Sequence, residues 1–371
     1  MTGAMYAAIS GMKAHMQKLN VIGNNIANIN TPAFKASQAL FSESIYTTLT
    51  SGSNGSDSAG GVNPSQLGYG CNLGSVAMDM STASFSADGN GMHCMIDGNG
   101  FFLTGDKPAA TLTDPADPSK STRTLAETES QNLELGRVGD FKFDSNGYLV
   151  DARGHVIYGF VTYTTDAKNI IDDAKNPKTS TQLVPIRLPI AAGSPAGAGD
   201  PAAGTALYPT LGTADGKGNQ MNLYPAGSGN AIKVDNIAID KTTGKITANN
   251  TADGSIVVVG YLALGTVANP DGVTRLENGY YQAGEGAGNC TATSIGGTVK
   301  GNLNNHADGT GATAILSSGK TALITGGLES SGTDLATEIA EMITTQRGYQ
   351  ANTRIITVTD SMLEEMVNMK R

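Results

Sequence analysis

Few residues in this 371-residue sequence stand at spacings that could support chemistry. The tetrapeptide 318–321, Ser-Gly-Lys-Thr, resembles the end of a phosphate-binding loop, in which backbone amides and a lysine hold the phosphates of a nucleotide. That motif requires a glycine at position 314, where this chain has Ala314. We therefore do not expect a nucleotide site.

A second segment has some features of a calcium loop. Asp144, Asn146 and Gly147 resemble its opening, where carboxylate and amide oxygens alternate around the ion. Here the glycine stands at the fourth position of the motif instead of the sixth, and the twelfth position holds no glutamate. A β-hairpin turn is the better interpretation.

The histidines do not form a metal-binding pattern. His15, His93, His155 and His306 are scattered, with neither an i, i+4 pair nor an HExxH motif. His93 precedes Cys94, but neighbours along a strand point to opposite faces, so the pair does not predict a reactive thiolate. We expect no catalytic, cofactor-binding or metal-binding residues, and no enzyme activity.

The cysteines do not predict a metal site or a set of disulfides. Cys71, Cys94 and Cys290 are an odd set without C-x-x-C spacing, which indicates neither a zinc site nor a set of disulfides. Buried cysteines behave as small apolar residues, and this is the default expectation for all three.

Composition excludes further classes. The chain carries 24 basic against 33 acidic residues, whereas nucleic-acid binders need clustered lysine and arginine. No apolar run approaches the ~20 residues needed to cross a bilayer, and the first residues lack the pattern of a signal peptide. We expect no nucleic-acid partner, no membrane insertion and no cleaved signal peptide.

The two ends of the chain show helical periodicity. Spacings of three and four residues, with one step of seven, define an apolar stripe near the N-terminus at Met5, Ile9, Met12, Met16, Leu19 and Ile26. The first helix should span residues 2–28 and stop before Pro32, which disfavours helix at the preceding residue.

A second stripe closes the sequence. A seven-residue step selects Leu328, Leu335, Met342, Tyr349, Ile356 and Leu363, with Ile339 and Val367 at alternate positions. The last helix should begin near Thr333 or Asp334, either of which can cap it, and continue to about Lys370. Gly348 inside this helix indicates either a close helix contact or a flexible point, and we favour close packing. Two helices of this kind are expected to pair with each other and to drive assembly.

The interior predicts β structure. Glycine makes up 48 of the 371 residues, tryptophan is absent, and short apolar segments alternate with turn residues. Hairpins are predicted around the turns 97–100 and 144–147, and further strands at 232–239, 245–248 and 255–267. Residues 51–61 are predicted to be a loop or an extended arm, and 165–228 is rich in proline, alanine and glycine.

These patterns predict an α+β multidomain chain. Terminal helices at 1–30 and 327–371 are expected to pair as a coiled coil, with a linker at 31–70. An all-β core spans 71–160 and 229–326, and 161–228 is an inserted β-rich outer domain or loop.

Motifs at both ends resemble those of a known family, the flagellar rod and hook axial proteins of bacteria. The segment 19–35, LNVIGNNIANINTPAFK, is similar to the N-terminal signature of that family, and 326–371 is similar to its closing helix. Segments 95–103, 137–160 and 258–273 resemble its β-domain motifs. The signature positions are Asn24, Asn25, Asn28, Asn30, Thr31, Phe34, Lys35, Gln346, Arg347 and Tyr349.

The resemblance implies a structural subunit that polymerises with copies of itself. It also implies that the terminal helices form an inner domain, with 31–70 as an arm. The extra length between 161 and 228 makes the chain look most like the subunit of the hook, the flexible universal joint that transmits torque from rod to filament around an export channel. A distal rod subunit is the alternative. The implied partners are rod and hook-filament junction proteins, the hook cap and the flagellar type III export apparatus, and the implied location is the extracellular hook. Some proteins of this kind join a cysteine to a lysine of a neighbouring subunit through dehydroalanine, but the sequence assigns no residue to that role.

Overall fold

The structure is a computed structural model and divides into two compact units, one of Met1–Asp79 with Ser331–Arg371 and one of Met80–Ser330. We call the first the terminal unit and the second the body. The residues described are 2–55, 60–105, 123–124, 133–144, 147–162, 179–186, 188, 234–251, 254, 256–288, 290–295, 299–301, 313–315 and 321–369.

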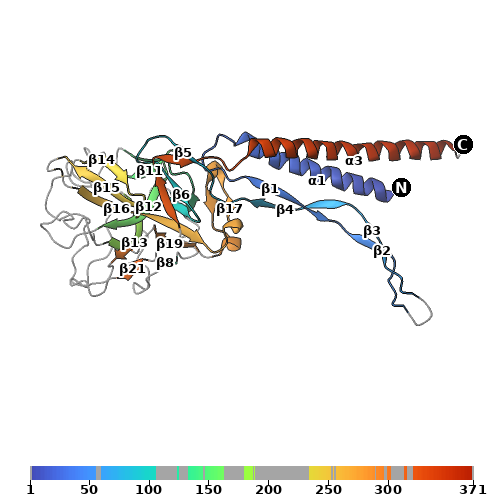
Figure 1. The fold of residues 1–371 in the computed structure, drawn as a ribbon, viewed down its shortest axis with the longest axis horizontal. Helices are drawn as coiled ribbons and strands as arrows, with labels where there is room; N and C mark the ends of the chain where they lie inside the picture. Colours follow the sequence, from blue (N-terminus) through green and yellow to red (C-terminus); the bar gives the residue numbers. More distant parts are fainter. Residues whose placement is uncertain are drawn as a thin grey trace, which may run out of the picture. The chain divides into compact units, whose positions relative to one another are not determined.

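Two long helices dominate the terminal unit. Helix α1 (Thr2–Ala27) and helix α3 (Leu335–Met369) lie side by side and antiparallel (Figure 1). Asp334 caps α3, because its carboxylate accepts the N–H of Ala336 at 3.0 Å and the hydroxyl of Thr337 at 2.7 Å. The two predicted helices are therefore confirmed, with Asp334 rather than Thr333 as the cap.

The chain after α1 forms a two-stranded arm. Strand β1 (Ser37–Glu43) pairs antiparallel with β4 (Cys71–Met78), and β2 (Tyr46–Thr50) pairs with β3 (Ser65–Gly68). Beyond β2 an isolated bridge joins Ser53, in the segment 51–61 expected to be a loop or extended arm, to Val62 just after that segment; residues 56–59 lie outside the described residues. Since β4 pairs with β1, the boundary between the units falls after Asp79 rather than at residue 71.

The body is built on one large sheet. Its main path runs β17-β18-β9-β7-β16-β12-β13-β20-β21, with β10, β11, β14, β15, β19 and β8 attached at the sides. The bounds are β7 (Phe101–Gly105), β8 (Arg123–Thr124), β9 (Glu134–Gly136), β10 (Phe141–Phe143), β11 (Leu149–Asp151), β12 (Val156–Thr162), β13 (Thr179–Pro185), β14 (Val234–Ile239), β15 (Lys245–Asn250), β16 (Ile256–Val267), β17 (Thr274–Arg275), β18 (Tyr281–Gln282), β19 (Cys290–Ser294), β20 (Val299–Gly301) and β21 (Thr313–Ile315). Three short 3-10 helices stand among them, η1 (Pro270–Gly272), η2 (Glu277–Gly279) and η3 (Glu285–Ala287).

Strand β16 is the centre of this sheet. It pairs with β7, β12, β15 and β19, and its middle residues are buried, as expected for a nearly continuous apolar run. Phe102 and Phe141 meet edge to face in the core at 4.9 Å between ring centroids. The other fully buried core members include Ile96, Leu149, Ile157, Ile186, Leu262, Leu264 and Ile295.

Two small sheets complete the body. Strand β6 (Cys94–Asp97) pairs with β22 (Ala322–Thr325), and β5 (Phe85–Ala87) pairs with β23 (Gly327–Glu329). The chain thus enters the body just before β5 and leaves it just after β23.

The predicted hairpins had different outcomes. Strands β10 and β11 pair as predicted, with Phe143 opposite Leu149 across the turn. The prediction for the turn 97–100 was wrong, because β6 pairs with β22 while β7 pairs with β9, β12 and β16. The buried guanidinium of Arg137 donates to the carbonyls of Gly98 and Gly100 at 2.9 and 2.7 Å, so the turn bridges two sheets with its carbonyls satisfied.

Part of the predicted insertion belongs to the body sheet. Strand β13 pairs antiparallel with β12, and Ile186 and Leu188 are buried in the core cluster. Residues 163–178, 187 and 189–228 of the predicted range 161–228 lie outside the described residues, as do His306, Asn146 and the lysine of the tetrapeptide 318–321. In the part of the chain that the structure describes, neither long helix is apolar enough to cross a bilayer.

Candidate assembly site

Small residues let α1 and α3 approach closely. A Cβ atom placed on Gly348 would lie 2.7 Å from the ring of His15, and one placed on Gly11 would lie 2.7 Å from the amide nitrogen of Asn352. A side chain at either position would force the His15 ring or the Asn352 amide to move. The prediction that Gly348 marks close packing is confirmed.

Two polar ties fix the antiparallel register of the pair. Nζ of Lys18 lies 3.0 Å from Oε2 of Glu341, and Nδ2 of Asn25 donates to Oε1 of Glu338 at 2.8 Å. Partial burial raises the pKa of Glu338, although the Asn25 amide favours its charged form. Lys18 pairs with Glu341 and the later residue Asn25 pairs with the earlier residue Glu338, as two antiparallel helices require.

The predicted stripe on α1 is not its buried face. The most buried residues of this helix are Ala8, Gly11, Ala14, Ile22 and Asn25. Of the predicted stripe, Met16 is 51% exposed, while Met5, Ile9, Met12, Leu19 and Ile26 are only partly buried. Small side chains at the most buried positions let the two backbones approach, and the predicted stripe lies beside them, mostly partly buried.

The predicted stripe on α3 divides in a similar way. Met342, Tyr349, Ile356 and Leu363 are partly buried, whereas Leu335, Ile339 and Val367 are exposed. Leu328 was wrongly placed in the helix: it lies in strand β23, opposite Ser86, because backbone pairing with β5 continues up to Glu329. The seven-residue step was therefore extended one repeat too far towards the N-terminus, from Leu335, where α3 begins, to Leu328.

A second apolar stripe on α3 was missed from the sequence. It comprises residues spaced three or four apart, Ile355, Val358, Met362, Met366 and Met369, all exposed. Their regular spacing was the signal that could have revealed them. The stripe has no cover within the terminal unit, so this face is available to another chain.

The signature residues after α1 organise the junction of helix, arm and α3. Asn25 is 1% exposed, and its amide also donates to the carbonyl of Ser37 at 2.8 Å while its oxygen accepts the Ser37 N–H at 3.0 Å. The carbonyl of Phe34 accepts the N–H of Gly332 at 2.8 Å. Together these bonds tie the start of β1 and the approach to α3 to the end of α1.

The neighbouring signature positions close the end of α1. Nδ2 of Asn28 donates to the carbonyl of Asn24 at 2.9 Å, and the Thr31 hydroxyl donates to Oδ1 of Asn28 at 3.1 Å. Lys35 is fully buried, whereas Asn30 is exposed. Proline 32 follows directly, as expected for a helix stop.

On α3 two of the three signature positions face outward, and the third, Tyr349, is partly buried. Gln346 and Arg347 are exposed, and Nη1 of Arg347 reaches only Oε1 of Gln350 within the same helix, at 3.4 Å. These side chains do not build the α1–α3 contact, so their role lies outside it.

The arm also exposes many apolar side chains. They come from both of its strand pairs and from the segments beside them: Leu40, Phe41, Ile45, Tyr46, Leu49, Val62, Leu67 and Val76. A two-stranded ribbon is marginally stable on its own in water, and exposed apolar groups of this number mark interaction surfaces.

The described residues give no support for metal or thiol chemistry. They contain no group of three or more histidine, cysteine or acidic side chains placed to hold a metal ion. All three cysteines are free; burial raises the pKa of the Cys94 thiol and raises that of Cys290 to about 11. Both buried thiols are protonated and unreactive near neutral pH.

Comparison with known protein families gives two matches, one at each end of the chain. Residues 5–35, which cover α1 and its signature, match the family described as flagella basal body rod protein. Residues 324–369, which include β23 and α3, match the family described as flagellar basal body rod FlgEFG protein C-terminal. The chain carries the terminal domains of the flagellar rod and hook proteins.

Relatives of both types match over the whole chain. The chain is 29% identical to the flagellar basal-body rod protein FlgG of Bacillus subtilis over 377 residues, with all of both chains covered. It is 26% identical to the flagellar hook protein FlgE of Borreliella burgdorferi over 467 residues, again with all of both chains covered. With the hook protein FlgE of Salmonella typhimurium it shares 25% identity over 449 residues, covering 98% of this chain and 99% of the relative. These matches show a structural subunit of flagellar hook or rod type.

Proposed function

We propose that this chain is the subunit of the flagellar hook, which polymerises with copies of itself into the flexible joint between rod and filament. The observation that best supports this proposal concerns the two segments that match the family models. They fold into the terminal unit, whose apolar residues remain largely exposed. A chain with this function needs no catalytic site, cofactor or nucleic-acid partner.

The exposed surfaces suit an open polymer. The stripe Ile355–Met369 on α3 and the apolar arm are different surfaces of one unit, so a copy that uses one leaves the other free. Contacts between unlike surfaces do not close on themselves and generate a helical filament. In this proposal the predicted coiled-coil layer forms around the channel from the α1–α3 pairs of many subunits.

The signature residues have a place in this polymer. Gln346 and Arg347 point away from the contact with α1 and would meet neighbouring subunits, with Tyr349 and Met342 packed closer to the helix pair. The seam residues Met16, Ile339 and Val367, exposed in the single chain, would be covered in the same way.

A distal rod subunit is the second candidate. The alignment with the Bacillus subtilis rod protein needs 377 positions for a chain of 371 residues, whereas the two hook alignments need 449 and 467. Length therefore favours the rod, while several of the relatives are hook proteins. The inserted outer domain predicted at 161–228 would favour the hook if it folds outward from the body.

The remaining partners and the location follow from the hook assignment. The subunit would leave the cell unfolded through the flagellar type III export apparatus, without a cleaved signal peptide. It would add beneath the hook cap in the extracellular hook and contact rod proteins at one end and hook-filament junction proteins at the other.

Electron microscopy of flagellar structures from cells that lack this gene tests the assignment. We expect basal bodies with a complete rod and no hook, and complementation with the full-length gene should restore the hook. Basal bodies that stop before the distal rod would establish the rod subunit instead, and intact hooks would refute both.

A further inference from the structure

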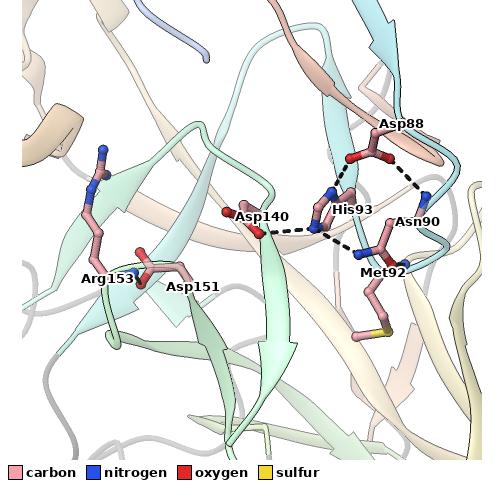
Figure 2. A network of polar contacts seen from close by, with 7 residues as sticks. All are labelled: Asp88, Asn90, Met92, His93, Asp140, Asp151 and Arg153. Atoms are coloured by element: carbon pink, nitrogen blue, oxygen red, sulfur yellow. Dashed lines mark hydrogen bonds and ion pairs between the residues drawn. The ribbon is translucent and has the colours of Figure 1, made fainter. Parts of the chain in front are cut away.

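A turn in the body holds a histidine between two aspartates (Figure 2). Nδ1 of His93 contacts the carboxylate of Asp88, and Nε2 lies 3.0 Å from Oδ1 of Asp140. Nε2 also lies 3.0 Å from Nδ2 of Asn90. The amide of Asn90 is oriented by its own oxygen, which accepts the N–H of Met92 at 3.1 Å.

Nε2 of His93 cannot satisfy both neighbours at once. In the neutral ring with a proton on Nδ1, Nε2 has a lone pair and accepts a hydrogen bond from the Asn90 amide. In the charged ring both nitrogens carry protons, so Nε2 donates to Asp140, and the Asn90 amide then faces another donor. Asp88 accepts from Nδ1 in either state. Binding of one proton therefore changes the partner of Nε2 from Asn90 to Asp140.

Backbone packing brings Asp140 to this position. The N–H of Cys94 donates to the carbonyl of Gly139 at 3.0 Å. A Cβ atom on Gly139 would lie 1.7 Å from the carbonyl oxygen of Cys94, so only glycine allows this approach. The pairing of Gly139 with Cys94 sets Asp140 beside His93.

The turn also fastens the strands at which the chain enters and leaves the body. It joins β5 to β6, and Gly326 stands opposite, between β22 and β23. The carbonyl of Gly326 accepts the N–H groups of Asp88 and Gly89 at 3.0 and 3.1 Å, and its own N–H donates to the carbonyl of His93 at 2.8 Å. The position of His93 is thus coupled to both small sheets.

We propose that His93 is a proton-dependent latch of the body. Protonation moves Nε2 from Asn90, within its own turn, to Asp140 on the segment leading to β10, and so anchors the pairs β5–β23 and β6–β22 more firmly. The charged groups that face the ring are Asp88 from the turn and Asp140 from the neighbouring segment. Histidine is the side chain that ordinarily changes charge between pH 5 and 8. The proposal does not depend on the flagellar assignment.

Hydrogen exchange of the full-length chain at pH 6 and pH 8, corrected for intrinsic exchange rates, measures the latch. We expect the amides of 85–97 and 322–329 to be about threefold better protected at pH 6, the effect of one partly exposed ion pair. Asp140→Asn keeps the size of the side chain and removes its charge, and His93→Gln removes the titrating group. His93→Gln should bring the ratio close to one, and Asp140→Asn should lower it towards one, because the contact of His93 with Asp88 remains.

His155→Gln is the matched control. Its imidazole lies 3.1 Å from Glu134 elsewhere in the body, so this variant should keep the threefold ratio at 85–97. An unchanged ratio in Asp140→Asn, or a wild-type chain without the pH response, would overturn the latch. Should His93→Gln disrupt the turn at both pH values, Asp140→Asn still decides, because the contacts of His93 with Asp88 and Asn90 remain in it.

Discussion

The terminal unit and the body differ in where they keep their apolar side chains. Among the described residues, the only large apolar side chains that the body exposes are Phe85 and Ile256. The terminal unit exposes such residues along both helices and the arm, and its buried apolar residues are Ala8, Ala14, Ile22, Ala33 and Ala36. The body therefore has a core of its own, whereas the terminal unit needs neighbouring chains to bury its surface.

The largest effect is expected at the exposed stripe of α3. Met362→Glu would place a charge in an apolar contact between subunits, and we expect the critical concentration for polymerisation to rise about 100-fold. Because Met362 is exposed in the single chain, the free energy of unfolding of the monomer should change by less than about 0.5 kcal/mol. Sedimentation of polymer as a function of concentration measures the first quantity and chemical denaturation the second.

Ser361→Glu is the control for that variant. It adds the same charge at an exposed polar position next to Met362. Polymerisation should be affected much less than by Met362→Glu. Equal effects of the two variants would mean that net charge, and not the apolar stripe, limits assembly.

A core substitution in the body should lower the stability of the body and leave the helices of the terminal unit unchanged. Phe102 is fully buried and packs edge to face on Phe141. Phe102→Ala should cost about 3 to 5 kcal/mol of the free energy of unfolding of the body, from lost apolar burial and the cavity left behind. Helical circular dichroism at low denaturant should be unchanged, since α1 and α3 belong to the other unit. Simultaneous loss of both signals would show that the units unfold together.

The helix contact allows a more selective test. Gly348→Leu would force a side chain into the ring of His15 and should destabilise the terminal unit by about 1 to 3 kcal/mol, despite the better helix propensity of leucine. Adding His15→Ala should recover part of that loss, because it removes the atoms in the way. The coupling energy from the four chains, wild type, two single variants and the double variant, reports the contact itself. Additive effects would place the cost elsewhere.

The sequence predicted the elements better than their contacts. Both helices could be predicted from periodicity and capping, since α1 ends just before Asn28 and Asp334 precedes α3. The α1–α3 interface was predicted only in part: Gly348 indicated close packing, whereas Gly11 has no side chain and so adds nothing to the apolar pattern. The pairing of β6 with β22 joins segments more than two hundred residues apart, and local turn signals at 97–100 carry no information about it.

The candidate site was likewise only partly visible. Asn25 was identified through resemblance alone, and the structure gives the physical reason: one side chain satisfies the backbone of Ser37 and reaches Glu338 of α3. The exposed stripe from Ile355 to Met369 had a regular spacing, but the first seven-residue step drew attention to another face. Burial, which separates these two faces, is a property of the fold and not of spacing.

The smallest expected effect is that of pH on stability. As the pH falls, the terminal unit should become less stable and the body more stable. Burial, and to a lesser degree the charge of Lys18, lowers the pKa of His15 below its usual 6.5. The unfolded chain then binds a proton more readily, so this contribution to the stability of the terminal unit is present above pH 6.5 and is lost as the pH falls through the folded value. The latch at His93 predicts a body that becomes more stable as the pH falls over the same range.

Helix unfolding followed by circular dichroism between pH 5.5 and 7.5, in wild type and in His15→Gln, isolates the effect on the terminal unit. The variant lacks the titrating group, so it should lose the acid-dependent part of the decline in stability. An identical decline in both chains would assign it to other groups, but not to Glu338: burial raises the folded pKa of that carboxyl, so its protonation as the pH falls favours the folded helices.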